Sequence, residues 1–199
     1  MAGVTALPWG DPLTYDDLQR MPDDGHRYEL VDGVLLVTPA PGSAHQVCVV
    51  ALVTLLHNHC PPGLVVLTAP YDYVVNTTTV LQPDLLVAHR DDLSEANLTR
   101  TPLLVVEVRS PSTWRTDLGT KRLAYEGAGV PHYWVVDPDE PGAVVFALQE
   151  GSYQETARAA GDEELEITEP FPLTLVPQRL VERFRRPNTT DLGPPLPTP

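Results

Sequence analysis

The chain of 199 residues lacks the features that mark several classes of protein. It has only two cysteines, Cys48 and Cys60, with neither the paired spacing of a zinc site nor the density of a disulfide scaffold. No apolar run approaches the roughly 18 residues of a membrane span, and the first residues lack the basic start and apolar centre of a signal peptide. We therefore expect a cytoplasmic protein with no membrane partner.

Positive charge is also scarce, because 13 basic residues face 27 acidic ones and the formal net charge is −14. The field of such a chain repels nucleic acids, so any phosphate-binding site has to be local. Five basic residues do gather within 23 positions, namely Arg100, Arg109, Arg115, Lys121 and Arg122. This cluster is compatible with phosphate contacts and equally with a solvated helix face and loop.

Length and composition predict one folded domain followed by a short tail. A hydrophobic content of 42% with 20% charged residues is ordinary for a folded protein of this size. From Arg186 onwards, the segment RPNTTDLGPPLPTP contains five prolines and little apolar surface. We expect a domain over residues 1–185 and a disordered, proline-rich tail over residues 186–199.

Hydrophobic periodicity and turn signals predict alternating helices and strands. Thr14 caps a short helix, Asp32-Gly33 turns a hairpin, and Ser43 opens a buried helix with the spacing of a capping box. The predicted helices cover residues 12–20, 43–60 and 117–126, and the predicted strands cover residues 27–40 (the hairpin), 64–69, 71–76, 80–88, 103–110, 132–137 and 143–149, with a strand and short helix in 170–184. This order predicts the α/β class, a mixed sheet flanked by helices.

One carboxylate stands inside an apolar strand pattern, LLVVEVRS at residues 103–110. Because side chains alternate along a strand, Glu107 emerges near the end of a face that begins with Leu103 and Val105. An ionised carboxylate there is costly unless a cation meets it. Two interpretations stay open: an ion pair with Arg109 or another arginine at the sheet end, and a metal site.

A second carboxylate, Asp84, lies in the apolar run VLQPDLLVA at residues 80–88. Taken singly, Asp84 is compatible with a turn that precedes a strand. If its strand neighbours that of Glu107, two carboxylates converge with no matching pair of cations evident in the sequence. Two carboxylates in such close proximity either share a proton or bind a metal ion. Magnesium is a suitable metal, because it prefers hard oxygen ligands.

The chain has a single lysine, Lys121, since the other twelve basic residues are all arginine. A compact ammonium group differs chemically from a planar guanidinium. Lys121 lies one helical turn after Asp117, in a predicted helix that begins soon after the strand of Glu107. The ammonium group can therefore reach the end of that strand. The alternative is an exposed ion pair between Asp117 and Lys121.

Taken in order, these residues resemble a known family. Its pattern is carried by Pro83-Asp84, the run EVRSPS at residues 107–112, then Asp117, Lys121, Tyr125 and the stretch GVPHYWVVDP at residues 129–138. The segment YELVDG at residues 28–33 and the helix with His45 fit as well. Over residues 12–185 the chain resembles the Uma-type family of bacterial restriction-endonuclease-like proteins, a branch of the PD-(D/E)XK nuclease superfamily.

The resemblance implies a restriction-endonuclease-like fold and a metal site. Asp84 and Glu107 would bind Mg²⁺ or Mn²⁺, with the backbone carbonyl of Val108 as a further ligand. Glu29 matches an acidic position that completes the catalytic set in the family.

The resemblance also implies a catalytic lysine, and here the chain departs from the parent pattern. Arg109 stands where the E-x-K motif places the lysine. In branches where the lysine has moved to the following helix, the role falls to Lys121, which orients the attacking water or steadies charge in the transition state.

These expectations lead to one main hypothesis, a metal-dependent endonuclease that hydrolyses DNA phosphodiester bonds. It would act as a homodimer, because two active sites are needed to cut both strands at once. Arg109, Arg115 and Arg122 would hold flanking phosphates, unless they are ordinary surface charges. The alternative is a binding or interaction protein that keeps the nuclease fold without cleavage, and a glycosidase is disfavoured by the short chain and few aromatic residues.

Overall fold

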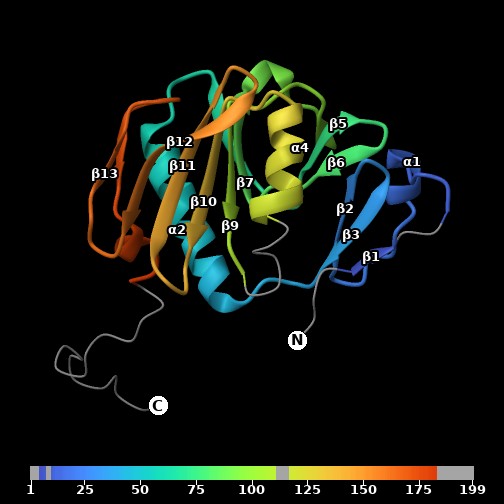
Figure 1. The fold of residues 1–199 in the computed structure, drawn as a ribbon, viewed down its shortest axis with the longest axis horizontal. Helices are drawn as coiled ribbons and strands as arrows, with labels where there is room; N and C mark the ends of the chain where they lie inside the picture. Colours follow the sequence, from blue (N-terminus) through green and yellow to red (C-terminus); the bar gives the residue numbers. More distant parts are fainter. Residues whose placement is uncertain (1–4, 8–9, 111–116, 183–199) are drawn as a thin grey trace, which may run out of the picture.

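A computed structural model describes residues 5–7, 10–110 and 117–182, shown as a ribbon in Figure 1. Arg115 and the predicted tail at residues 186–199 lie outside the described residues. None of the helices in the described part of the chain is long and apolar enough to cross a membrane.

The described strands form two six-stranded sheets and one two-stranded sheet. In spatial order, the first sheet contains β1 (Thr5–Leu7), β3 (Val34–Thr38), β2 (Arg27–Val31), β6 (Thr79–Leu81), β5 (Asp72–Asn76) and β8 (Asn97–Leu98). The second contains β12 (Ser152–Ala160), β11 (Gly142–Gln149), β10 (His132–Asp137), β9 (Leu104–Val108), β7 (Leu85–His89) and β4 (Leu64–Thr68). The small sheet pairs β13 (Leu165–Ile167) with β14 (Leu173–Leu175).

Within the described ranges, helices are few and mostly short. They are α1 (Tyr15–Leu18), α2 (Ser43–His59), the π-helical turn η2 (Asp117–Lys121), α4 (Arg122–Gly127), and the 3-10 turns η1 (Arg90–Asp92) and η3 (Pro177–Leu180). In the second sheet β9 and β10 run parallel, while the other neighbouring pairs are antiparallel. The parallel pair is joined through η2 and α4. The predicted class, a mixed α/β fold with helices on the sheet, is confirmed.

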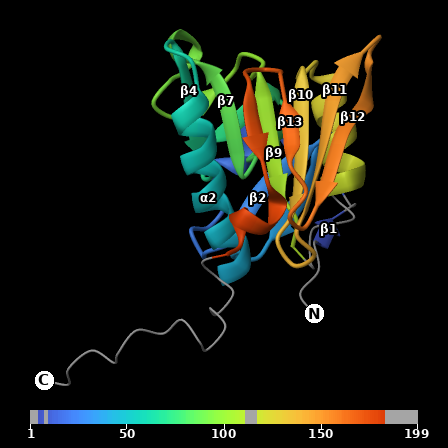
Figure 2. The same cartoon turned by 90° about the vertical axis from the view of Figure 1, so that its left-hand side faces the viewer.

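Helices cover both faces of the second sheet, as Figures 1 and 2 show for α2 and α4. Cys48, Leu52 and Leu56 of α2 pack on one face with the even-numbered residues of β9. Tyr125 of α4 packs on the other face with Val105. Because β9 is buried on both sides, an acidic side chain on it is also buried, and Glu107 is 1% exposed.

Several predicted elements match the structure closely. The strand expected at residues 132–137 is β10, and the helix expected at residues 117–126 is η2 followed by α4. The hairpin of β2 and β3 turns at Asp32 and Gly33, with φ of 51° and 78°. Two consecutive residues with positive φ are the requirement of a type I′ turn, which explains the Asp-Gly pair.

Two expectations for helix α2 were wrong. The N-cap is Gly42, not Ser43, and its end has no side-chain cap hydrogen bond, so the capping-box spacing was coincidental. The helix is also not buried all round: Leu52 and Leu56 are fully buried, whereas Val50 is 63% exposed. The helix therefore exposes some of its apolar side chains to solvent.

The most consequential difference concerns residues 80–88, predicted as one strand. This run forms two strands, β6 in the first sheet and β7 in the second, with Gln82, Pro83 and Asp84 between them. Proline has no N–H group to donate to a sheet ladder, so a break at Pro83 is expected in physical terms. The chain crosses between the two large sheets here, and Asp84 lies at the crossing point.

Candidate functional site

The candidate site begins with Asp84, immediately before β7, and Glu107, on β9. The two strands pair antiparallel with Leu85 opposite Val106, so continuing this register places Asp84 opposite Glu107. The backbone N–H of Val108 donates a hydrogen bond to Asp84 Oδ2 at 2.8 Å. Both carboxylates therefore lie at the same end of two adjacent inner strands of the second sheet.

Lys121 joins two buried carboxylates in this cluster. Its ammonium nitrogen lies 2.8 Å from Glu29 Oε1 and 3.1 Å from Glu107 Oε1. Glu29 comes from β2 of the first sheet, and Lys121 ends the η2 turn. Lys121 is only 4% exposed, which excludes the exposed helical ion pair that was its alternative. The structure thus brings together the four side chains predicted for the catalytic set.

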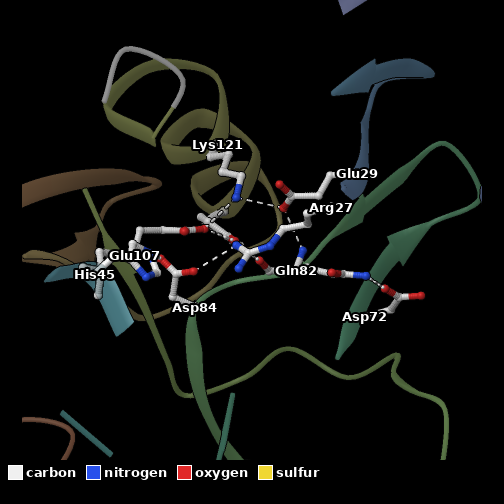
Figure 3. Close-up of polar contacts among 10 residues, drawn as sticks. Arg27, Glu29, His45, Asp72, Gln82, Asp84, Glu107 and Lys121 are labelled. Atoms are coloured by element: carbon white, nitrogen blue, oxygen red, sulfur yellow. Dashed lines mark hydrogen bonds and ion pairs between the residues drawn. The ribbon is translucent and has the colours of Figure 1, made fainter. Parts of the chain in front are cut away.

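Two basic side chains hold Asp84, a role that the sequence analysis assigned to neither of them. Arg27 Nη1 donates to Asp84 Oδ1 at 2.9 Å, and His45 Nε2 lies 3.0 Å from Asp84 Oδ2. Figure 3 shows Arg27 and His45 reaching Asp84 from β2 and α2. One signal was available, since Arg27 and Glu29 are two residues apart on a strand and so share a face.

Further hydrogen bonds fix the orientation of the glutamates. The Tyr125 hydroxyl donates to Glu107 Oε1 at 2.7 Å, and the backbone N–H of Gln82 donates to Glu29 Oε1 at 2.8 Å. The Gln82 side chain in turn donates to Asp72 Oδ1 at 2.7 Å. The residues at the crossing between the sheets therefore serve as a scaffold for the site as well as carrying Asp84.

The electrostatic setting keeps Asp84 ionised. Burial alone would raise the pKa of this carboxyl group, but the hydrogen bond from His45 and the charges of Arg27 and Lys121 outweigh it and hold the pKa below its ordinary value. For Arg27, burial opposes the charged form, whereas the carboxylates of Asp84 and the two glutamates raise the pKa of the guanidinium. Burial and the charge of Glu107 raise the pKa of Tyr125 well above its usual range, so its hydroxyl stays a donor.

The donor set suits a hard divalent cation. Glu29 is fully buried, yet its Oε2 atom has no hydrogen-bond partner among the described residues. Carboxylate oxygens are the ligands that Mg²⁺ and Mn²⁺ prefer. Within the described ranges, however, no three His, Cys, Asp or Glu side chains are arranged to hold a metal ion as they stand. Positively charged side chains already contact all three carboxylates: Lys121 contacts Glu29 and Glu107, and Arg27 contacts Asp84.

A pocket of about 560 Å³ opens beside the site. Its lining includes the polar side chains of Arg27, His45 and Asp84 and the apolar side chains of Val49 and Val53 of α2. A solvent-accessible hollow next to buried charged groups is where a substrate can reach them.

Of the three arginines predicted to hold phosphates, Arg109 and Arg122 contact residues outside the carboxylate cluster, and Arg115 lies outside the described residues. Arg109 pairs with Asp137 at 2.5 Å, at the end of β10. Arg122 donates to the carbonyl of Tyr153 at 3.0 Å and stacks over the ring of Phe146 at 4.5 Å. Arg122 is thus part of the packing between α4 and the sheet. The contact with nucleic acid stays a prediction for these residues and for Arg115.

Comparisons with known proteins identify a structure with the same fold and the family of this chain. A search of curated proteins finds no match. A crystal structure described as "a putative nuclease belonging to DUF820 from Anabaena variabilis" superposes with a TM-score of 0.68 and 19% sequence identity, covering 86% of this chain and 98% of that one. This likeness establishes a shared fold.

The family model named Uma2, described as "Putative restriction endonuclease", matches residues 15–182. The matched segment contains Glu29, Asp84, Glu107 and Lys121 together with most of the described strands. Because the match extends over well more than half of the sequence, the chain belongs to the Uma2 family of restriction-endonuclease-like proteins.

Proposed function

We propose that the protein is a metal-dependent endonuclease that hydrolyses phosphodiester bonds in DNA. The observation that carries the proposal is the position of Asp84 and Glu107 at the same end of two adjacent strands, with Lys121 bonded to Glu107 and a pocket open at Asp84. A nuclease-like function follows from the family and the fold. The identity of the substrate and the need for a metal are the further steps proposed here.

Each residue of the cluster has a role that its contacts support. Asp84 and Glu107 would hold the divalent cation, Mg²⁺ or Mn²⁺, together with the backbone carbonyl of Val108. When bound, such a cation makes a coordinated water more acidic and stabilises negative charge on phosphoryl oxygens. Lys121 presents a fixed positive charge to the same developing charge, and Glu29 keeps its ammonium group in place.

The surrounding hydrogen bonds act on geometry. The hydroxyl of Tyr125 restricts Glu107, and the N–H of Val108 restricts Asp84, so both carboxylates are preorganised. The proposal includes a cytoplasmic location, as expected from the sequence, and a homodimer, since cutting both strands in one event requires two such sites. Arg109, Arg115 and Arg122 would contact flanking phosphates.

The direct test is nicking of supercoiled plasmid in the presence of Mn²⁺. Asp84→Asn and Glu107→Gln keep side-chain size but remove the charge, and each should lower the nicking rate by on the order of a hundredfold or more. Glu155→Gln is the matched control, because Glu155 is an ion-paired carboxylate at the exposed edge of the sheet. Equal rates for wild type and both site variants would overturn the proposal.

Two observations favour a second function, a binding protein that keeps the fold without cleavage. As the chain stands, Arg27 and Lys121 already neutralise the acidic groups, and the net charge of −14 disfavours DNA. Calorimetric titration with Mn²⁺ separates the two functions. Binding that is lost in Asp84→Asn supports the nuclease, and no binding with or without DNA supports the interaction protein.

A further inference from the structure

Arg27 occupies an unusual place in the cluster. Its Nη1 atom donates to Asp84 Oδ1 at 2.9 Å and to the carbonyl oxygen of Gln82 at 3.1 Å. Its side chain is 18% exposed and lines the pocket, whereas the Asp84 side chain is 3% exposed. Arg27 and Asp84 therefore both line the pocket, and the guanidinium is the more exposed of the two.

The charges of the cluster are arranged in two groups. Lys121 bridges Glu29 and Glu107 from the side of the helix, and it is buried. Arg27 neutralises Asp84 from the side of the pocket. A divalent cation that binds Asp84 from the pocket and the guanidinium of Arg27 require the same carboxylate.

We propose that Arg27 is a built-in competitor of the metal: it holds Asp84 in the metal-free protein and must leave this carboxylate when the divalent cation binds. The proposal rests on the proposed function, since it takes Asp84 as a metal ligand. It also gives a reason why Asp84 is already engaged in this structure although the donor chemistry of the site fits a metal.

The released guanidinium has a defined place to go. Arg27 is already on the wall of the pocket, next to the position where a phosphodiester bound near Asp84 would lie. A guanidinium binds phosphate oxygens through two parallel N–H donors, a geometry that suits this exchange. Metal binding would thereby convert Arg27 from a carboxylate partner into a phosphate ligand in the same site.

The opposite role makes the opposite prediction. If Arg27 only orients Asp84 for the metal, its removal should weaken metal binding, as loss of a partner behind a ligand usually does by 10–100-fold. If Arg27 competes, its removal should strengthen metal binding, because the variant leaves a buried carboxylate with less positive charge around it. The sign of the change in affinity therefore distinguishes the two roles without any measurement of cleavage.

The experiment is calorimetric titration of the full chain with Mn²⁺ for wild type, Arg27→Met and Arg20→Met. Methionine keeps an unbranched stem without the charge, and Arg20 is the control because its pair with Asp17 is exposed. Arg27→Met should bind Mn²⁺ on the order of tenfold tighter or more than wild type. Arg20→Met should match wild type.

Failure of this proposal differs from failure of the proposed function. If wild type binds Mn²⁺ through Asp84 and Arg27→Met binds no tighter, the competition is excluded and the nuclease proposal stands. If neither protein binds Mn²⁺, both proposals fall. If Arg27→Met does not fold without metal, the gain in Tm caused by Mn²⁺ is measured for Arg27→Lys instead, since a lysine is a poorer partner for a carboxylate. The proposal then requires a larger gain for Arg27→Lys than for wild type, and an equal or smaller gain overturns it.

Discussion

The molecule contains two kinds of ion pair that use the same functional groups in different surroundings. Lys121 bridges Glu29 and Glu107 with all three side chains at most 5% exposed. Arg158 pairs with Glu155 at 2.6 Å, but these side chains are 67% and 38% exposed. The exposed pair is shorter, so distance alone does not separate the two regions; burial does.

This difference indicates why the buried cluster exists. Exposed pairs exchange well-solvated ions for a weak, screened contact and contribute little to stability. A buried cluster carries a large desolvation cost, and well-packed apolar residues in its place are often as stable or more stable. Stability therefore does not explain three buried carboxylates with Arg27 and Lys121, and such a cluster beside a pocket is a candidate functional site.

The largest expected effect comes from removing the cation that two buried carboxylates share. Lys121→Met should lower the free energy of unfolding by about 3–5 kcal/mol, because Glu29 and Glu107 would be left as uncompensated buried charges. Its nicking rate should fall on the order of a hundredfold or more. Urea unfolding and plasmid nicking with Mn²⁺ measure the two quantities.

Two further variants test whether burial is the cause of this effect. Arg158→Met removes a cation from the exposed pair and should leave both the unfolding midpoint and the nicking rate at the wild-type level. Lys121→Arg keeps the charge but presents a larger planar group, so a catalytic lysine requires a clear loss of rate. Full activity in Lys121→Arg and Lys121→Met would remove Lys121 from the mechanism.

A smaller effect is expected from one hydroxyl at the edge of the cluster. Tyr125→Phe removes the donor to Glu107 Oε1, which should cost about 1–3 kcal/mol of stability. It should also weaken Mn²⁺ binding about tenfold, since Glu107 loses a group that orients it. Unfolding and calorimetric titration check these values.

Tyr153→Phe is the matched control for Tyr125→Phe. The Tyr153 hydroxyl is also a buried donor, but it bonds to the carbonyl of Val130 at 2.8 Å, away from the carboxylates. A similar loss of stability with unchanged Mn²⁺ binding is the expected result. If both variants bind Mn²⁺ equally well, the hydroxyl of Tyr125 has only a structural role.

The part of this site that could be predicted from sequence is the part carried by local pattern. Glu107 stands out because a charge interrupts an apolar strand, and Lys121 because no other lysine is present. The Asp-Gly turn and the strand at residues 132–137 follow from equally local signals. In each case the neighbours that define the pattern lie within a few residues.

The rest depends on contacts between distant segments. Arg27 and His45 reach Asp84 across 57 and 39 residues, so their positions in the sequence do not identify Asp84 as their partner. Strand β12 was missed because its sequence SYQETARAA is largely polar, as befits the outer strand of the second sheet. The division of residues 80–88 between two sheets required the tertiary fold, although Pro83 marked the place.

The smallest expected effect concerns two carboxylates whose pKa values are both lowered, the buried Asp84 and the more exposed Glu155. Burial opposes ionisation of Asp84, but His45 and Arg27 outweigh it, and a hydrogen bond from Arg158 lowers the pKa of Glu155. Because the pKa of Asp84 is lower in the folded protein than its ordinary value of 3.8, the unfolded chain takes up this proton first. Its contribution to stability is therefore complete above about pH 4 and is lost as the pH falls further.

Asp84→Asn has no proton to take up at this position, so its stability should fall less steeply than that of wild type below about pH 4. The difference in slope should approach about 1.4 kcal/mol per pH unit, the value for one proton. Urea unfolding in a chelating buffer at high salt, repeated over this pH range, gives the slopes. Glu155→Gln should follow the wild-type slope, because salt screens the exposed pair but reaches the buried one far less. Parallel slopes for wild type and Asp84→Asn would mean that the buried and exposed carboxylates are held alike, and the distinction between the two regions would fail.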